Sequence, residues 1–225
     1  MSQFRRPMFG SRIRSPFFGG RSRKALRSLA VQGFPTAGVL DNFNRADESP
    51  LAAATWNAAF GEPTLKVLTN VCGNDVSPGG MQIWANQFTA DQEVFFTVST
   101  VPANTGVFTV AVRNQSATIY RTFGQLIDTY FAEFSFPDAV TNGVVKIFRQ
   151  VEDVTTQLGA NISLGVPMAA AQVLGLRVKG SVLTVWRDGI ELDTQTDTNI
   201  TAAGNLVVVC SDTTMRFDNF GGGAI

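Results

Sequence analysis

Most of this chain consists of short apolar segments separated by turn-forming residues. Several segments alternate apolar and polar side chains, the pattern of a β-strand with one buried face. In one of them Tyr130, Ala132, Phe134 and Phe136 share a face, and Phe131 lies on the other. No amphipathic pattern extends over the ~12 residues of a stable helix. Many short strands of this kind predict an all-β fold, an antiparallel two-sheet jelly-roll sandwich.

The predicted strands cover the apolar segments from residue 38 to residue 220. They are 38–42, 64–71, 81–85, 93–100, 107–113, 129–136, 144–150, 154–158, 172–179, 181–187, 190–194, 205–210 and 215–220. Gly221, Gly222 and Gly223 follow the last strand and are interpreted as a flexible end.

Asp188-Gly189 is the clearest turn signal, because this dipeptide is typical of a two-residue type I′ hairpin. The hairpin pairs Arg187 with Ile190, Trp186 with Glu191, Val185 with Leu192 and Thr184 with Asp193. Leu183, Val185, Ile190 and Leu192 then face the core. The same register predicts Trp186, Glu191 and Asp193 together on the opposite face, an aromatic ring beside two carboxylates.

Residues 1–37 differ in composition from the rest and are predicted to form a basic, extended N-terminal arm on a sandwich domain of residues 38–225. Residues 1–40 hold eight basic and no acidic residues, a net charge of +8, and the remaining chain carries −8. Phenylalanines alternate with arginines, glycines and prolines, so the arm alone buries too little apolar surface to order itself. The residues predicted to bind a partner are Phe4, Arg5, Arg6, Phe9, Arg12, Arg14, Phe17, Phe18, Arg21, Arg23, Lys24 and Arg27.

Several classes of function lack their sequence signals. The chain has no histidine, which excludes His-based catalytic triads and most zinc sites. No apolar run reaches the ~18 residues of a membrane span, and no secretion signal is recognised. Cys72 and Cys210 fit no CxxC pattern and are expected to be buried free thiols, with a disulfide left open. We therefore predict no cofactor, no metal, no membrane association and no catalytic residues.

Motifs near both ends of the sandwich resemble a known family. They are DNFNRAD at 41–47, Trp56, LRVKGSVLTVWRDG at 176–189 and RFDNF at 216–220. Together they resemble the concanavalin-A-like (laminin-G-like) jelly roll found in bacteriophage virion proteins, over roughly residues 38–222. The resemblance implies that the first and last strands are neighbours, with Phe43 and Phe220 in the core and the adjacent Asp and Asn side chains fixing turns.

The resemblance implies a bacteriophage virion structural protein, a capsid decoration (cement) or neck or tail accessory protein, and not an enzyme. The arm would anchor it to other virion proteins, whether capsid, portal-neck or tail subunits, and order on binding them. The expected location is the virion, and the expected assembly is a homo-oligomer such as a trimer. Arginines alternating with phenylalanines also suit single-stranded nucleic acid, which we rank below protein docking.

A carbohydrate-binding, lectin-like module that recognises host-surface glycans is the alternative function. Trp186 would stack on a sugar ring, and Glu191 and Asp193 would accept hydrogen bonds from sugar hydroxyls. A one-residue error in register would bury Trp186 instead.

Two further hypotheses follow from the same family. Its retaining glycoside hydrolases carry a strand resembling Glu-x-Asp-x-Glu, which Glu191 and Asp193 match and Gln195 does not. Many members bind calcium, and oxygen ligands of the right type are present. These are Asp41, Asn42, Asp47, Asp218 and Asn219.

Overall fold

The computed structural model describes residues 33–58, 63–74, 76, 79–101, 105–116, 128–137 and 140–225. Within them every regular element is a strand. The strands are β1 (Val39–Asp41), β2 (Trp56–Ala58), β3 (Lys66–Leu68), β4 (Val71–Gly73), β5 (Gly80–Phe88), β6 (Gln92–Thr100), β7 (Gly106–Asn114), β8 (Thr129–Phe136), β9 (Asn142–Val151), β10 (Val154–Pro167), β11 (Val173–Lys179), β12 (Val182–Arg187), β13 (Ile190–Thr196), β14 (Gly204–Cys210) and β15 (Arg216–Ala224).

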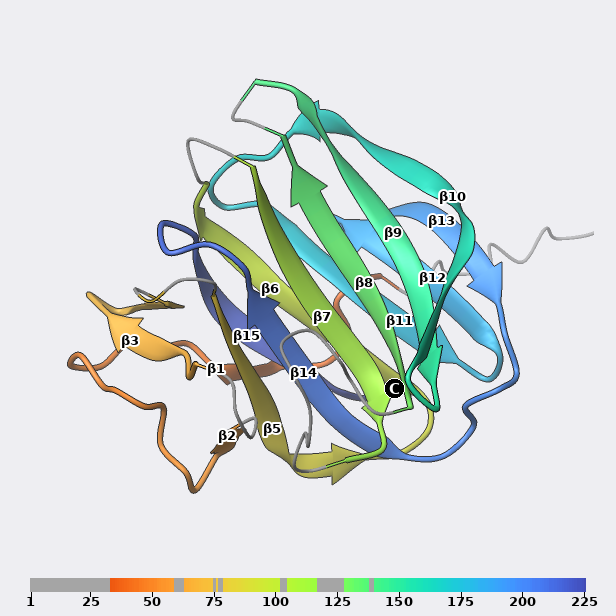
Figure 1. The fold of residues 1–225 in the computed structure, drawn as a ribbon, viewed down its shortest axis with the longest axis horizontal. Coiled ribbons are helices and arrows are strands. Elements are labelled where there is room, and N and C mark those ends of the chain that lie inside the picture. The colour runs from red at the N-terminus through yellow and green to blue at the C-terminus, as the bar shows by residue number, and fades with distance from the viewer. Residues whose placement is uncertain are drawn as a thin grey trace, which may run out of the picture. The chain divides into compact units, whose positions relative to one another are not determined.

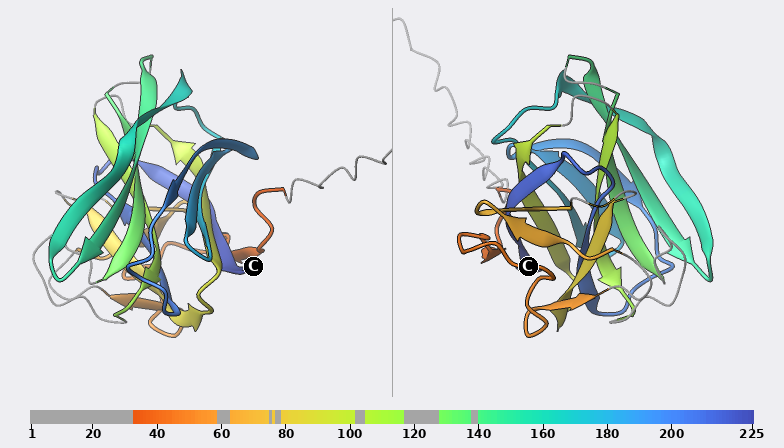
Figure 2. Two further views of the ribbon diagram at one scale, coloured as in Figure 1. Left: turned by 90° about the vertical axis from the view of Figure 1, so that its right-hand side faces the viewer. Right: turned by 60° about the vertical axis from the view of Figure 1, so that its left-hand side comes forward.

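The strands form two antiparallel sheets that pack face to face, as predicted (Figures 1 and 2). Sheet A has the order β13-β12-β11-β6-β15-β4-β3, with β1 also paired to β15. Sheet B has the order β10-β9-β8-β7-β14-β5-β2. Half of the neighbouring pairs in these orders join strands that are not consecutive in sequence, as in Greek-key sandwiches.

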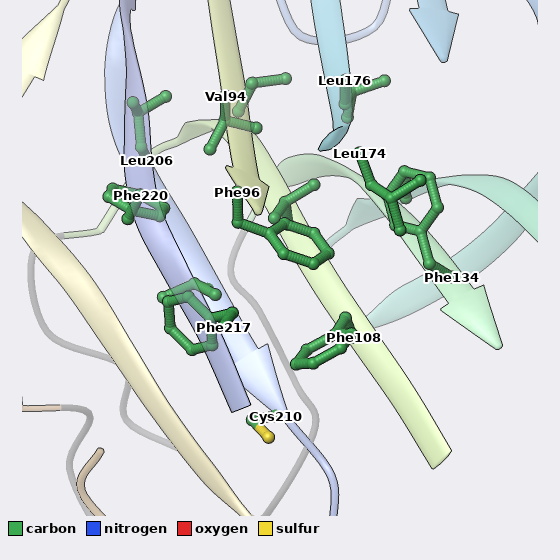
Figure 3. Packing of buried hydrophobic residues seen from close by; sticks show 14 of the residues in the cluster. Val94, Phe96, Phe108, Phe134, Leu174, Leu176, Leu206, Cys210, Phe217 and Phe220 are labelled. Atoms are coloured by element: carbon green, nitrogen blue, oxygen red, sulfur yellow. The ribbon is translucent and has the colours of Figure 1, made fainter. Parts of the chain in front are cut away.

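The core between the sheets is built from the inward positions of alternating strands. Figure 3 shows Phe96, Phe108, Phe134 and Phe217 meeting from four strands, and the rings of Phe96 and Phe108 lie 4.8 Å apart. Burying such a ring contributes about 1.5–3 kcal/mol to stability. The predicted inward face of β8 is confirmed, because each of its four apolar residues is fully buried. Phe131 points outward and stacks on Phe148 instead.

The two ends of the sandwich meet at β1 and β15, as the family resemblance implied. Val39 pairs with Gly221, and Asp41 pairs with Phe220. Phe43 and Phe220 are both fully buried. The Asp41 carboxylate accepts a hydrogen bond from the Phe43 backbone N–H at 2.9 Å, which fixes the turn that sends this ring inward.

Trp56 belongs to the same part of the core and is tied to a chain of charged groups. Its indole Nε1–H donates to Asp41 Oδ2 at 2.9 Å. Arg45 donates to Asp41 at 2.7 Å and to Glu48 at 2.6 Å. The hydrogen bond to Asp41 is the largest cause of a raised Arg45 pKa. The Trp56 N–H and the Asp41 carboxylate therefore both have partners.

The fold corrects two sequence predictions and adds one strand that was missed. The predicted strand 64–71 is a hairpin of β3 and β4, because Thr69 and Asn70 both adopt positive φ and reverse the chain. The short strand β2 was not predicted. Residues 221–223 are not a flexible end but part of β15, where a Cβ at Gly222 would overlap the Glu93 carbonyl oxygen.

Cys72 and Cys210 are both buried and free, as expected. Burial raises the pKa of the Cys210 thiol to about 12, with a smaller opposing effect from a hydrogen bond to the Asp212 backbone. Both thiols therefore stay protonated at neutral pH.

A buried polar cluster closes one end of the sandwich. Tyr130 donates its hydroxyl proton to Asp197 at 2.6 Å and accepts a hydrogen bond from the Ile200 N–H. Arg149 also binds Asp197, at 2.7 Å. Burial, followed by the hydrogen bond to Asp197, raises the pKa of Tyr130 to about 12.

Candidate functional site on the outer face of sheet A

The predicted arm is described only at its C-terminal end, residues 33–37. The twelve residues predicted to bind a partner, all between positions 4 and 27, lie outside the described residues. Residues 33–37, named the strap here, contact the sandwich through Phe34, Thr36 and Ala37. The strap therefore packs on the sandwich and belongs to the same compact unit as the two sheets.

The strap lies on three neighbouring strands of sheet A. Gly175 of β11 pairs with Trp186 of β12 on one side and with Phe95 of β6 on the other. The neighbouring residues of these strands, such as Leu174, Leu176 and Val94, point into the core, so this row points outward. Phe95, Gly175 and Trp186 are named the cradle here.

The Phe34 ring fills the cradle. It stacks on the Trp186 indole with ring centroids 5.2 Å apart and planes 6° from parallel. It meets Phe95 edge to face at 6.3 Å and 77°. A Cβ at Gly175 would overlap the Phe34 ring, so only glycine leaves room for it. The three rings are 4–6% exposed, although they face away from the core.

A buried ion pair forms the polar half of the site. Arg177 Nε donates to Glu93 Oε2 at 2.8 Å, and the side chains are 9% and 0% exposed. The guanidinium carbon also lies 5.3 Å from the Phe34 ring centroid and 5.2 Å from that of Trp186, within cation–π range. The negative charge of Glu93 and the positive charge of Arg177 cancel, so the pair carries no net charge.

The strap backbone completes the hydrogen bonding of this pair. Glu93 Oε1 accepts the backbone N–H groups of Thr36 and Ala37 and, at 3.1 Å, the Thr36 hydroxyl. Arg177 donates to the Gly33 carbonyl oxygen at 3.0 Å. Breaking such a buried pair by removing one partner is costly, because it leaves an uncompensated charge.

One polar group in the cradle is not satisfied by the strap. The Trp186 indole Nε1–H is buried, and no residue in the described part of the chain accepts its proton. A buried donor without an acceptor costs about 1–3 kcal/mol.

The residues predicted to bind glycan are only partly brought together. Arg187 pairs with Ile190 and Trp186 with Glu191, and both Asp188 and Gly189 have positive φ, so the predicted type I′ turn is confirmed. Beyond that point a bulge pairs Val185 with Asp193 instead of Leu192. The prediction that Asp193 shares the face of Trp186 is therefore wrong, because the extra residue in β13 shifts the later pairs.

The carboxylates of β13 do not converge. Glu191 is exposed beside Trp186, while Asp193 accepts a hydrogen bond from Gln195 Nε2 at 2.7 Å on the other side of the bulge. The glycan contact predicted for Trp186, Glu191 and Asp193 stays a prediction.

The ion pair beside Trp186 was not predicted from the sequence: Arg177 lies over the Trp186 ring, and Glu93 binds Arg177. Glu93 and Arg177 stand at outward positions of β6 and β11 and pair across the two strands. A single acid in β6 and an arginine within the apolar part of β11 were the available signal. Neither strand's neighbours were known from sequence, so their meeting was not predictable.

The residues considered as calcium ligands already have hydrogen-bond or ion-pair partners. The calcium candidates are engaged within the fold: Asp41 binds Arg45, Asp47 accepts the Thr69 N–H at 2.6 Å, and Asp218 accepts the Asn219 N–H at 2.7 Å. The described residues contain no group of three or more metal-ligating acids or thiols. None of the described segments is a helix long and apolar enough to cross a membrane.

The outer face of sheet B carries a different aromatic pair. Phe131 and Phe148 stack with centroids 4.9 Å apart, and apolar residues of three further strands, β5, β7 and β14, pack around them. Nearby, burial raises the pKa of Glu133, and Lys146 opposes this effect. Among the described residues, no ion pair as buried as Glu93–Arg177 lies beside these two rings.

Comparison with known proteins identifies the fold. No protein-family model and no curated protein sequence matches the chain. β-Agarase A from Zobellia galactanivorans is 11% identical with a TM-score of 0.58, covering 82% of this chain and 90% of the agarase. A protein of unknown function with a galectin-like fold from Bacillus subtilis is 8% identical (TM-score 0.52, 68% and 81% covered).

Porphyranase B from Zobellia galactanivorans is similar at 10% identity and a TM-score of 0.51, with 81% of this chain and 90% of the porphyranase covered. At such low identity these likenesses speak for the fold and not for a shared activity. The chain therefore has a two-sheet jelly-roll β-sandwich fold, similar to the folds of these proteins.

Proposed function

We propose that the sandwich is a lectin-like module that binds carbohydrate without cleaving it. The observation that carries the proposal is the outward row of aromatic rings on sheet A with a carboxylate–guanidinium pair beside it. Sugars combine an apolar C–H face with a rim of hydroxyls, so sites for them pair an aromatic plate with a few placed polar groups.

A carbohydrate complex of a protein with a similar fold also supports this proposal. A structure of β-agarase A in complex with oligoagarose has a TM-score of 0.60 to this chain at 10% identity. This sandwich architecture therefore holds carbohydrate in at least one protein of similar topology.

The arrangement of β13 supports binding rather than hydrolysis. A retaining glycosidase needs two carboxylates about 5 Å apart that face one substrate. Here Glu191 lies beside Trp186, Asp193 lies beyond the bulge, and Gln195 occupies the position of the third acid. If the protein hydrolysed any polysaccharide and Glu191→Gln removed that activity, the non-enzymatic proposal would be wrong.

A glycan array tests the proposal directly. The full chain is expected to bind a subset of neutral glycans, and Trp186→Ala is expected to reduce that binding at least tenfold. Phe148→Ala is the matched control, because it removes a stacked ring from the outer face of the other sheet. Equal glycan binding by the wild type and by Trp186→Ala would mean that Trp186 is not part of the glycan-binding site, which would contradict the proposed location of that site on sheet A.

A structural role in a bacteriophage virion is the second candidate, with the arm as the anchor to other virion proteins. The supporting observation is the division of charge, +8 in residues 1–40 against −8 in the rest. Deletion of residues 1–32, which leaves the strap intact, is expected to abolish co-sedimentation with particles. Normal incorporation of the shortened chain would contradict the anchoring role.

A further inference from the structure

The strap satisfies the cradle with the same set of contacts that a sugar ring offers. Phe34 places a flat apolar surface on Trp186. Two backbone N–H groups and one hydroxyl donate to a single carboxylate oxygen of Glu93. One carbonyl oxygen accepts from Arg177. A pyranose presents an apolar C–H face, adjacent hydroxyl donors and oxygen acceptors in a similarly small space.

We infer that the strap is a displaceable cover that occupies the glycan site, and that the ligand is a neutral hexose glycan bound by Trp186, Glu93 and Arg177. This inference rests on the proposed function and adds to it the polar residues, the ligand class and the competitor. Once the strap leaves, Glu93 Oε1 is free to accept two sugar hydroxyls, and Arg177 is free to donate to a third oxygen.

The charge of the site sets the ligand class. Glu93 and Arg177 neutralise one another, so the site offers no unpaired cation to a sulfate or carboxylate. The exposed Glu191 beside Trp186 adds a negative charge, which disfavours anionic sugars. A neutral glycan meets neither penalty.

The contacts of the strap explain why it can leave without unfolding the sandwich. Residues 33–37 belong to no strand of either sheet, and their ring cluster is separate from the main core. Among the described residues none accepts the Trp186 Nε1–H, so the strap leaves this donor unsatisfied, whereas a hydroxyl-bearing ligand brings additional acceptors. The apparent affinity for glycan is reduced by the fraction of molecules in which the cover is open.

The test compares full-length wild type, Phe34→Ala, Phe34→Ala/Trp186→Ala and Phe148→Ala by calorimetric titration. The probes are oligoagarose, laminaritetraose and the strongest neutral binder of the glycan array. Phe34→Ala is expected to bind at least one probe ten times or more as tightly as the wild type. The double variant is expected to lose this gain, and Phe148→Ala is expected to match the wild type.

The outcomes separate the cover from the proposed function. Equal, measurable affinity in wild type and Phe34→Ala overturns the cover and leaves glycan binding intact. No binding by either protein overturns both. If Phe34→Ala fails to unfold cooperatively, Thr36→Pro replaces it, because proline removes one N–H donated to Glu93 and retains the ring. Tighter binding by this variant supports the cover, and unchanged affinity overturns it.

Discussion

Trp56 and Trp186 are buried almost equally, at 1% and 4% exposure, but by different means. Trp56 lies in the main core, against Trp84 and Phe220, and its N–H donates to Asp41. Trp186 points outward and is covered by Phe34 of the strap, with its N–H unsatisfied among the described residues. Burial alone therefore does not distinguish a ring that holds the fold together from one that a short segment conceals.

The largest difference in the free energy of unfolding is expected between the variants Trp56→Ala and Trp186→Ala. Trp56→Ala should lower the free energy of unfolding by about 3–5 kcal/mol, because it leaves a cavity in the closed core. Trp186→Ala should cost about 1.5–3 kcal/mol, because the strap can relax and water can enter. Denaturant titration of both variants measures the difference. Equal losses would mean that the cradle is as closed as the core.

The carboxylates beside the two rings provide the second comparison. Glu93→Ala should cost about 3 kcal/mol, because it leaves the nearly buried Arg177 without its counter-charge. Asp41→Ala should cost about 1–2 kcal/mol, because Arg45 is 35% exposed and keeps Glu48, so the main loss is the acceptor of the Trp56 N–H. Denaturant titration of both variants measures these losses. A larger loss for Asp41→Ala than for Glu93→Ala would contradict the assignment of a buried ion pair to the site beside the cradle.

Removal of the Phe34 ring should act locally. Phe34→Ala is expected to cost about 1–2 kcal/mol and to accelerate exchange of the Thr36 and Ala37 amide hydrogens at least tenfold. The Trp56 amide, which donates to the Ala52 carbonyl at 2.9 Å, should exchange as in the wild type. Hydrogen exchange read residue by residue checks this, and acceleration at both sites would indicate that the strap and core open together.

The Tyr130 cluster gives a pH-dependent reference that neither tryptophan site supplies. Its pKa of about 12 in the folded chain exceeds the value near 10 expected after unfolding. The folded state therefore binds the proton more tightly, and stability should fall as pH rises from about 10 to about 12. Tyr130→Phe should abolish this part of the pH dependence. If the stability of Tyr130→Phe still fell between about pH 10 and about pH 12 as in the wild type, a group other than Tyr130 would cause the loss.

The fold was predictable where side-chain alternation and turn chemistry agree. The inward face of β8 and the Asp188-Gly189 turn follow from local sequence, and the burial of Phe43 and Phe220 was implied by the family resemblance. The hairpin at Thr69-Asn70 was missed because this pair is a weaker turn signal than Asn-Gly or Asp-Gly. The bulge in β13 was missed because it depends on packing across strands and not on the residues of β13 alone.

The candidate site was less predictable than the fold. Trp186 was identified from its register, but its neighbours come from β6, β11 and the strap, at positions 93, 95, 175, 177 and 34. Only the strand order of sheet A brings these segments together. Phe34 was assigned to the arm because the sequence around it is rich in glycine and proline, and nothing local indicates that its ring stacks on a sheet.

The position of the strap also determines how the sandwich responds to mechanical load. A pull applied through the chain from the N-terminal side reaches Phe34 first, then the Glu93 hydrogen bonds, and only then the pairing of β1 with β15. The contacts of the strap would break before any strand is extracted. Under tension, release of the strap would let residues 33–37 extend while the two sheets and the core between them stay intact.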